Sequence, residues 1–262
     1  MKRTLTLLLL LLNCSLNAQE LSAGLVERFE LQTGHFVGVD DLGNVYYVND
    51  DILFKKSANR LFSYSNVALG ELHSVDIRNP FKIVLFYADF NAVILLDNNL
   101  NELTEKIDFT GGTLFNNVRF VTGASQNNLW IYADDNKLHL YDYEGLQELF
   151  QTQAMTFYEP EFVASGLVST YKKAWILSER EILEFNEYGV FTRRYDIEGA
   201  SGIYPYKKGF FYVKESAIFY RDEKLELPVT MDWDKSFESI YVNSSNIFVY
   251  DGTTVYQYQL LR

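Results

Sequence analysis

The clearest structural unit in the sequence is the stretch Asp40-Asp41-Leu42-Gly43-Asn44-Val45-Tyr46-Tyr47-Val48-Asn49-Asp50-Asp51-Ile52-Leu53-Phe54. Its Asp-x-x-Gly-Asn start is typical of a hairpin bend that needs a positive φ. The runs that follow are rich in the β-branched and aromatic residues that suit a pleated sheet. The stretch therefore predicts a turn, a strand, a second turn and a second strand.

The same unit recurs along the whole chain. Apolar runs that match the first of these strands occur at residues 45–48, 83–86, 129–132, 174–177, 210–213 and 247–250. Their starts are 38, 46, 45, 36 and 37 residues apart, close to the roughly 40–50 residues of a four-stranded propeller blade. The partner strands follow in phase at 52–54, 93–96, 138–141, 182–185, 217–220 and 255–258. The sequence therefore predicts an all-β fold, a six-bladed β-propeller of four-stranded blades.

Each repeat continues into a polar turn and a more charged outer strand, clearest at residues 105–109 and 193–197. Charge on an edge strand discourages pairing with other sheets, so it needs no functional explanation. The sixth unit has no such strand, whereas residues 27–31 have the outer-strand pattern without a unit of their own. We expect this N-terminal strand to complete the last blade and close the ring.

The N-terminus has the pattern of a secretory signal peptide. Lys2 and Arg3 precede an apolar run at residues 5–12, and Ala18 offers a small residue at the cleavage point. The run is shorter than the about 20 apolar residues that cross a bilayer, so we expect a signal at 1–18 and one domain at 19–262 that does not span a membrane. The alternative is a lipid anchor at Cys14, against which Asn13 argues, because lipoprotein signals usually have a small residue there.

Composition limits the classes of partner. The full chain carries a formal charge of −12, and loss of Lys2 and Arg3 with the signal leaves 21 basic against 35 acidic residues, a charge of −14. This charge disfavours binding to nucleic acid. No cysteine remains after cleavage at Ala18, so the core alone must hold an exported fold. The export signal and the lack of cysteine point to a bacterial envelope, with the protein in the periplasm or associated with the outer membrane.

Two short motifs carry a resemblance to known propellers. The Asp40-x-x-Gly43-Asn44-Val45-Tyr46 segment resembles six-bladed propellers of the NHL and YncE-like kind, which include gluconolactonase-like proteins, and residues 126–131 resemble a Leu-Trp-Ile unit of periplasmic sensor propellers. Units two, four and five depart from the Asp-x-x-Gly-Asn form. The resemblance implies a fold that serves hydrolases, lyases, sensors and scaffolds alike.

The residues that could carry chemistry are sparse. His35 and His73 open two predicted first strands and would meet only if both faced the channel, while His139 has the spacing of a residue packed on a sheet face. Adjacent acids in a strand point to opposite faces and cannot share one site. We therefore assign no catalytic residue, cofactor or metal. The alternative to a binding protein is a lactonase-, glycosidase- or lyase-like enzyme for a sugar or lactone, with a site assembled from separate blades.

Two kinds of aromatic position can be distinguished. Trp130 and Trp175 occupy matching positions in predicted second strands, where packing between blades explains them. Trp233 lies in the polar connection 230–235, where an exposed indole would contact a partner or a sugar. A Trp233 folded over the core is the other reading.

Charge is predicted to divide between the two faces of the ring. Turns between second and third strands share a face with the connections between blades, and an acid occurs in each: Asp50, Asp51, Asp89, Asp134, Asp135, Glu179, Glu215 and Asp251. Turns between first and second strands hold Arg78, Lys82, Lys172, Lys173, Lys207 and Lys208. Asp suits turns in any case, but that preference does not explain why the lysines segregate. We expect a binding or scaffolding protein whose acidic face recognises an envelope protein, with a small molecule or cation in the channel as the other partner to consider.

Overall fold

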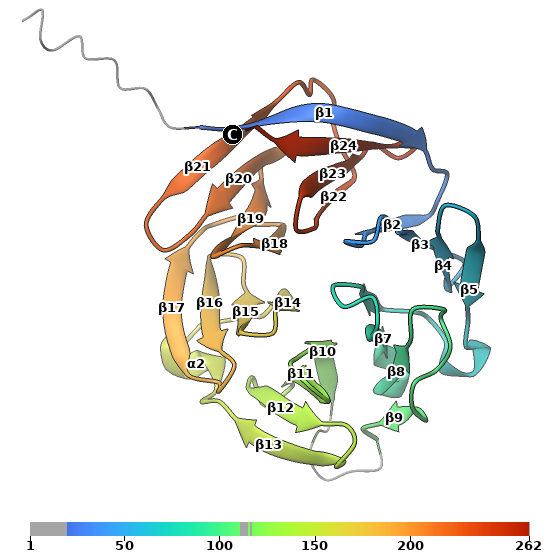
Figure 1. Ribbon diagram of the computed structural model, residues 1–262. Coiled ribbons are helices and arrows are strands. Elements are labelled where there is room, and N and C mark those ends of the chain that lie inside the picture. The colour runs from blue at the N-terminus through green and yellow to red at the C-terminus, as the bar shows by residue number, and fades with distance from the viewer. Residues whose placement is uncertain (1–19, 111–114, 116, 262) are drawn as a thin grey trace, which may run out of the picture.

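The computed structural model describes residues 20–110, 115 and 117–261. The described chain is all-β and forms four sheets of four strands and one sheet of eight strands. Figure 1 shows these sheets standing around a central axis.

The two inner strands of each four-stranded group follow the predicted repeat. The first strands are β2 (His35–Val39), β6 (Ser74–Asp76), β10 (Val118–Gly123), β14 (Gly166–Ser169), β18 (Gly202–Tyr206) and β22 (Ser239–Val242). The second strands are β3 (Val45–Asn49), β7 (Ile83–Tyr87), β11 (Asn128–Ala133), β15 (Lys173–Leu177), β19 (Gly209–Lys214) and β23 (Asn246–Tyr250). Each second strand contains the apolar run that predicted it, which confirms the repeat.

The outer half of each group is more polar. The third strands are β4 (Ile52–Lys56), β8 (Ala92–Leu96), β12 (Leu138–Asp142), β16 (Glu181–Asn186), β20 (Ala217–Arg221) and β24 (Thr254–Leu260). The last strands are β5 (Leu61–Tyr64), β9 (Ile107–Asp108), β13 (Gln147–Gln151), β17 (Phe191–Asp196), β21 (Glu226–Met231) and, paired with β24, β1 (Leu21–Glu30). Short helices η1 (Val67–Leu69), η2 (Ala88–Phe90) and α2 (Met155–Tyr158) lie between strands. Half-buried and exposed residues alternate along β13 and β21, as expected of outer strands with one face toward solvent.

Strand β1 joins the start of the chain to its end. It pairs antiparallel with β24 from Ala23 opposite Leu260 to Glu30 opposite Thr254, which confirms the predicted pairing of the N-terminal strand. Its first residues also pair in parallel with β21, with Leu21 opposite Val229. The sequence did not predict this second pairing. It arises because β1 is ten residues long, so that its first residues extend beyond the end of β24 and pair with β21 along the other edge of β1. This pairing merges two groups into the eight-stranded sheet.

The core is divided into six clusters of buried residues, each between neighbouring groups of strands. Trp130 packs with residues of β15 and β16, and Trp175 packs with residues of β18 and β19. Both tryptophans thus fill the space between sheets, as the sequence predicted. The cluster that contains Phe36 and Phe248 connects the last group to the first. Apolar packing therefore continues around the whole ring.

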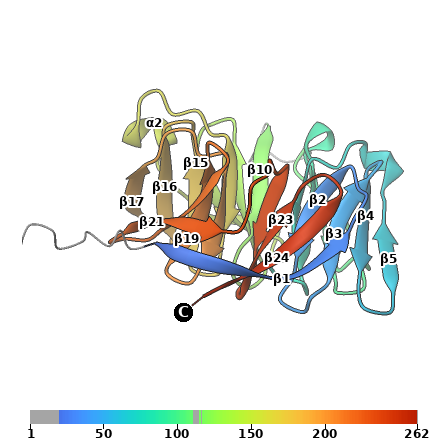
Figure 2. The same cartoon turned by 90° about the horizontal axis from the view of Figure 1, so that it is seen from above.

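The ring has two faces that differ in which loops they carry. We call the side with the turns between second and third strands and with the links between groups the connection face. We call the side with the turns between first and second strands the cavity face. Figure 2 shows the ring from its edge, with α2 projecting on the connection face.

The predicted signal at 1–18, including Cys14, lies outside the described residues. In the part of the chain that the structure describes, no helix has the length and apolar character needed to cross a membrane.

Because β1 closes the ring, a chain that lacks most of this strand should be less stable. Deletion of residues 25–32 removes most of the β1–β24 pairs and exposes two sheet edges. Loss of several hydrogen bonds, each worth about 1 kcal/mol, should lower the melting temperature by at least roughly 10 °C in a protein of this size. Differential scanning calorimetry and size-exclusion chromatography measure both effects. A soluble monomer that melts at the wild-type temperature would show that β1 does not close the ring.

Candidate functional site

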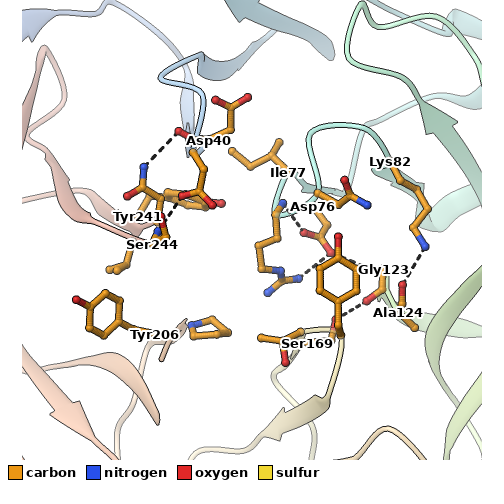
Figure 3. Close-up of a pocket in the computed structure, with 18 of the residues that line it drawn as sticks. Asp40, Asp76, Ile77, Lys82, Gly123, Ala124, Ser169, Tyr206, Tyr241 and Ser244 are labelled. Atoms are coloured by element: carbon orange, nitrogen blue, oxygen red, sulfur yellow. Dashed lines mark hydrogen bonds and ion pairs between the residues drawn. The ribbon is translucent and has the colours of Figure 1, made fainter. Parts of the chain in front are cut away.

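A cavity of about 390 Å³ opens on the cavity face around the central axis (Figure 3). Turns between first and second strands of every group contribute to its wall. The lining residues are Asp40 and Asp41, Asp76 to Asn79 with Lys82, Gly123 and Ala124, Ser169 to Tyr171, Pro205 to Lys207, and Tyr241 to Ser244. The cavity therefore exists only because the ring brings distant segments together.

The first wall of the cavity is the turn that opens the sequence motif. One carboxylate oxygen of Asp40 accepts hydrogen bonds from the backbone N–H groups of Leu42 (2.9 Å) and Asn44 (2.8 Å). The other accepts from the Tyr46 hydroxyl at 2.9 Å. Gly43 adopts the positive φ that this bend needs, 81°. Burial, followed by the nearby Asp40 charge, raises the pKa of Tyr46, so the phenol stays protonated. Asp40 is a structural acceptor in this site.

The neighbouring wall, from the β6–β7 turn, contains a partly buried ion pair. Asp76 Oδ2 lies 2.8 Å from Arg78 Nη2 and accepts hydrogen bonds from Thr122 Oγ1 (2.6 Å) and the Gly123 N–H (3.0 Å). Burial alone would raise the pKa of Asp76. The Arg78 charge and the hydrogen bonds from Arg78, Thr122 and Gly123 outweigh burial and hold the pKa below its usual value. The carboxylate is thus charged, and it orients Arg78 at the cavity.

The ammonium group of Lys82 is bound by backbone groups of the protein. Its ammonium group donates hydrogen bonds to the carbonyl oxygens of Ala124 (2.9 Å), Gln126 (2.6 Å) and Asn128 (3.3 Å). Figure 3 shows its side chain reaching toward Ala124. Burial lowers the pKa of Lys82, and the Asp76 charge partly opposes that change. The residue therefore fastens the β6–β7 turn to the β10–β11 turn, a role that the sequence did not reveal.

Other polar groups of the cavity are free to meet a ligand. Arg78 Nε and Nη1 and the hydroxyl of Tyr241 form no hydrogen bond with any described residue, and Lys207 Nζ lies 4.8 Å from the centre of the Tyr206 ring. Figure 3 shows Tyr206 across the cavity from Asp76. The Tyr241 ring is held close to Gly38, where a Cβ would lie 2.4 Å from it. The cavity thus offers cationic donors together with aromatic surfaces.

The acids predicted to bind a partner lie on the connection face, in separate turns. Asp50, Asp51, Asp89, Asp134, Asp135, Glu179 and Glu215 are exposed, and Asp251 is half-buried. Several also have local roles. Asp50 (φ 49°), Asp51 (φ 61°) and Glu215 (φ 50°) adopt positive φ in two-residue turns. Aspartate tolerates that conformation, but glutamate is not a favoured turn residue. Turn geometry alone therefore does not account for Glu215.

Three of these acids contact neighbouring residues. Asp51 Oδ1 accepts a hydrogen bond from the Leu72 N–H at 3.1 Å. Asp251 Oδ1 accepts hydrogen bonds from the N–H groups of Thr253 (3.0 Å) and Thr254 (2.8 Å). Asp135 Oδ1 lies 3.1 Å from His139 Nε2, and Glu148 Oε1 lies 2.6 Å from His139 Nδ1. His139 is 3% exposed, so the prediction of a residue packed on a sheet face is confirmed.

The remaining candidates are dispersed. Trp233 is half-buried, and its ring lies 5.0 Å from that of Tyr256 and 6.5 Å from that of Phe237. Trp233 therefore packs over the core, the second of the two arrangements considered from the sequence. His35 and His73 are exposed, and neither lines the cavity. Among the described residues, no group of three or more His, Cys, Asp or Glu has an arrangement that could hold a metal ion.

Sequence reasoning missed Asp76, Thr122 and Tyr241. Their only sequence signal is that each lies in or next to a first strand, and first strands line the axis of a ring. Arg78 and Lys82 were assigned to the correct face, but their different roles depend on Asp76 and on the backbone of another group.

The lowered pKa of Asp76 leads to a prediction about acid stability. A group whose pKa is depressed by folding stabilises the protein above its unfolded pKa, and this stabilisation is lost as pH falls through the folded pKa. Asp76→Asn should therefore lower stability at pH 7 by about 1–3 kcal/mol and lose less further stability on acidification than the wild type. Urea unfolding at pH 7 and pH 3 measures both. Asp89→Asn, an exposed change, is the control, and equal acid sensitivity of Asp76→Asn and wild type would contradict the assignment.

Solved structures are similar to this chain in fold. One is virginiamycin B lyase from Staphylococcus aureus, which is 10% identical in sequence with a TM-score of 0.59. The match covers 90% of this chain and 99% of the lyase chain. Another is the Pan2 WD40 domain from Neurospora crassa, which is 9% identical with a TM-score of 0.56. The match covers 84% of this chain and 72% of the Pan2 chain. A third is BBS1N in complex with ARL6DN, which is 10% identical with a TM-score of 0.57. The match covers 87% of this chain and 78% of that chain. No protein-family model and no curated protein matches the sequence. The resemblance to NHL and YncE-like propellers stays a prediction, and at these identities the likeness establishes one thing, that the chain is a β-propeller.

Proposed function

We propose that the protein is an exported binding module of the bacterial cell envelope, in the periplasm or at the outer membrane, with residues 19–262 as a single six-bladed propeller. The blade count treats β18–β21 as the fifth blade and β22–β24 with β1 as the sixth. The six core clusters between neighbouring groups support this count. The antiparallel pairing of β1 with β24 supports closure of the last blade by the N-terminal strand.

The ligand of the cavity is a small ring-containing molecule with one carboxylate or similar anionic group. The observation that carries this proposal is the state of Arg78. Asp76 fixes its Nη2, while its Nε and Nη1 have no partner among the described residues. A guanidinium held on one side presents its remaining N–H groups to a carboxylate in a fixed geometry. Tyr206 and Tyr171, which line the same cavity, offer faces for a ring.

Binding fits this cavity better than catalysis does. A general acid or base must exchange a proton with its substrate. Asp40 and Asp76 are both buried or nearly so and accept several protein hydrogen bonds each. Lys82 is bound to three carbonyl oxygens. Asp40, Asp76 and Lys82 therefore hold the cavity wall in place. Arg78 and the tyrosines are the residues available to contact a ligand.

Isothermal titration calorimetry with 4-hydroxybenzoate and its neutral analogue 4-hydroxybenzamide tests the cavity. We expect the acid to bind and the amide to bind at least about tenfold more weakly, which corresponds to about 1.4 kcal/mol. Arg78→Gln should remove that preference. Arg60→Gln, which changes an exposed arginine outside the cavity, should keep it. Equal affinity for the acid and the amide, or an unchanged preference in Arg78→Gln, would refute the anionic ligand.

A second binding function is favoured by the acids of the connection face, where we propose that a basic segment of an envelope protein docks. An acid lies in the turn between second and third strands of every group. Such a rim raises a local negative potential that attracts cations and that salt weakens. Glu215 and Glu179 support a role in recognition, since neither is a favoured turn residue.

Substitution of Asp51, Asp89, Asp134 and Asp251 by Asn tests this face. Asn keeps the hydrogen-bond acceptor that Asp51 offers to the Leu72 N–H and Asp251 offers to the Thr253 and Thr254 N–H groups, so the fold should persist. Capture of a basic partner from an envelope extract at low ionic strength should fall several-fold, and added salt should reduce capture by the wild type. Undiminished capture by the variant would move the recognition site away from these acids.

A further inference from the structure

A buried carboxyl group on the connection face lacks one of its partners. Glu181, the first residue of β16, is 4% exposed. Its Oε2 lies 2.8 Å from Arg194 Nε, but its Oε1 is buried with no hydrogen-bond partner among the described residues. An unsatisfied buried acceptor costs about 1–3 kcal/mol, so a donor that reaches Oε1 would be stabilised there.

Glu181 lines a second cavity, of about 270 Å³, between the link from β13 to β14 and the β15–β16 turn. Five acids and two arginines line it, so the charge of the lining is −3 when the acids are ionised. The charged residues are Glu159, Glu161, Glu179, Arg180, Glu181, Arg194 and Asp196.

The arginines of this cavity do not balance its acids. Arg194 is shared between Glu181 and Glu159, with its Nη1 3.7 Å from Glu159 Oε2. Arg180 lies 3.5 Å from Glu161, and both side chains are more than 70% exposed, so this pair is weak. Burial, and then the charges of Glu159 and Asp196, raise the pKa of Glu181, while Arg194 opposes the change. An added cation would favour the ionised form.

The wall also includes apolar surface. Of its two apolar residues, Val163 is 67% exposed and Phe162 is buried. A lysine or arginine side chain lays its aliphatic stem on such surface and extends its charged head toward acceptors. The combination of an apolar rim and a negative interior therefore suits a cationic side chain of a protein.

We propose that this cavity, which we name the Glu181 pocket, receives a lysine or arginine side chain of the partner that docks on the connection face. The carboxylate of Glu181, whose Oε1 lacks a protein partner but is itself buried, turns toward the cavity to accept the cationic head. Glu159 and Glu179 supply additional negative charge. This inference rests on the proposed capture of a basic partner and assigns its central contact.

Fluorescence anisotropy with a labelled peptide of four lysines separated by alanines tests the pocket at low ionic strength. Glu181→Gln should weaken binding at least about fivefold. Since Glu181→Gln also loses a charge beside Arg194, the double variant Glu159→Gln and Glu179→Gln provides a test at less buried positions and should have a similar effect. The matched control is Glu144→Gln with Glu187→Gln, two acids in turns on the cavity face, which should bind as the wild type does.

The four-site Asn variant of Asp51, Asp89, Asp134 and Asp251 separates this inference from the proposed function. Weaker binding in that variant with wild-type binding in both pocket variants would overturn the Glu181 pocket and leave partner capture by the face intact. Wild-type binding in all variants would overturn both. Hydrogen–deuterium exchange gives an independent readout, because the peptide should protect residues 159–163 and 178–181. Protection confined to the cavity face would overturn the inference.

Discussion

The pairing of β1 with β24 closes the ring of sheets. It joins residues from the two ends of the chain through seven pairs, Ala23 to Glu30 against Leu260 to Thr254, and so removes two open edges. The same closure brings Tyr241 of β22 against Gly38 of β2. Together with the apolar cluster that contains Phe36 and Phe248, this pairing joins the last group to the first, so that the turns around the axis enclose one cavity.

Buried cations fix the groups relative to one another. Lys55 and Lys82 are 2% and 7% exposed, and each donates hydrogen bonds to oxygens of the next group, Lys55 to the carbonyl of Asn98 at 2.6 Å and Lys82 to the β10–β11 turn. Burying an ammonium group is costly unless its protons find acceptors, so these contacts specify one arrangement of neighbouring sheets. At the cavity, Lys82 thereby ties the β6–β7 turn to the β10–β11 turn.

Much of the fold could be predicted because its signals are local. The runs at 83–86 and 129–132 lie in strands β7 and β11, which are wholly buried and therefore apolar at every position. The outer-strand pattern at 27–31 was enough to predict pairing with the last strand. The extra pairing of Leu21 with Val229 depends on how far β1 extends, for which no residue pattern exists. The sites were harder, because Asp76 and Arg78 acquire their roles from Thr122 and Gly123, and Glu181 looks like the polar start of an ordinary strand.

We propose that closure of the ring turns six separate hairpin turns into one binding site for an anionic ring compound. A crystal structure of the protein soaked with 4-hydroxybenzoate would reveal where such a compound binds. We expect electron density for the ligand inside the cavity, with its carboxylate within hydrogen-bonding distance of Arg78 and its ring against Tyr206 or Tyr171. Density for the ligand only outside the cavity, or a carboxylate placed away from Arg78, would refute the proposed site.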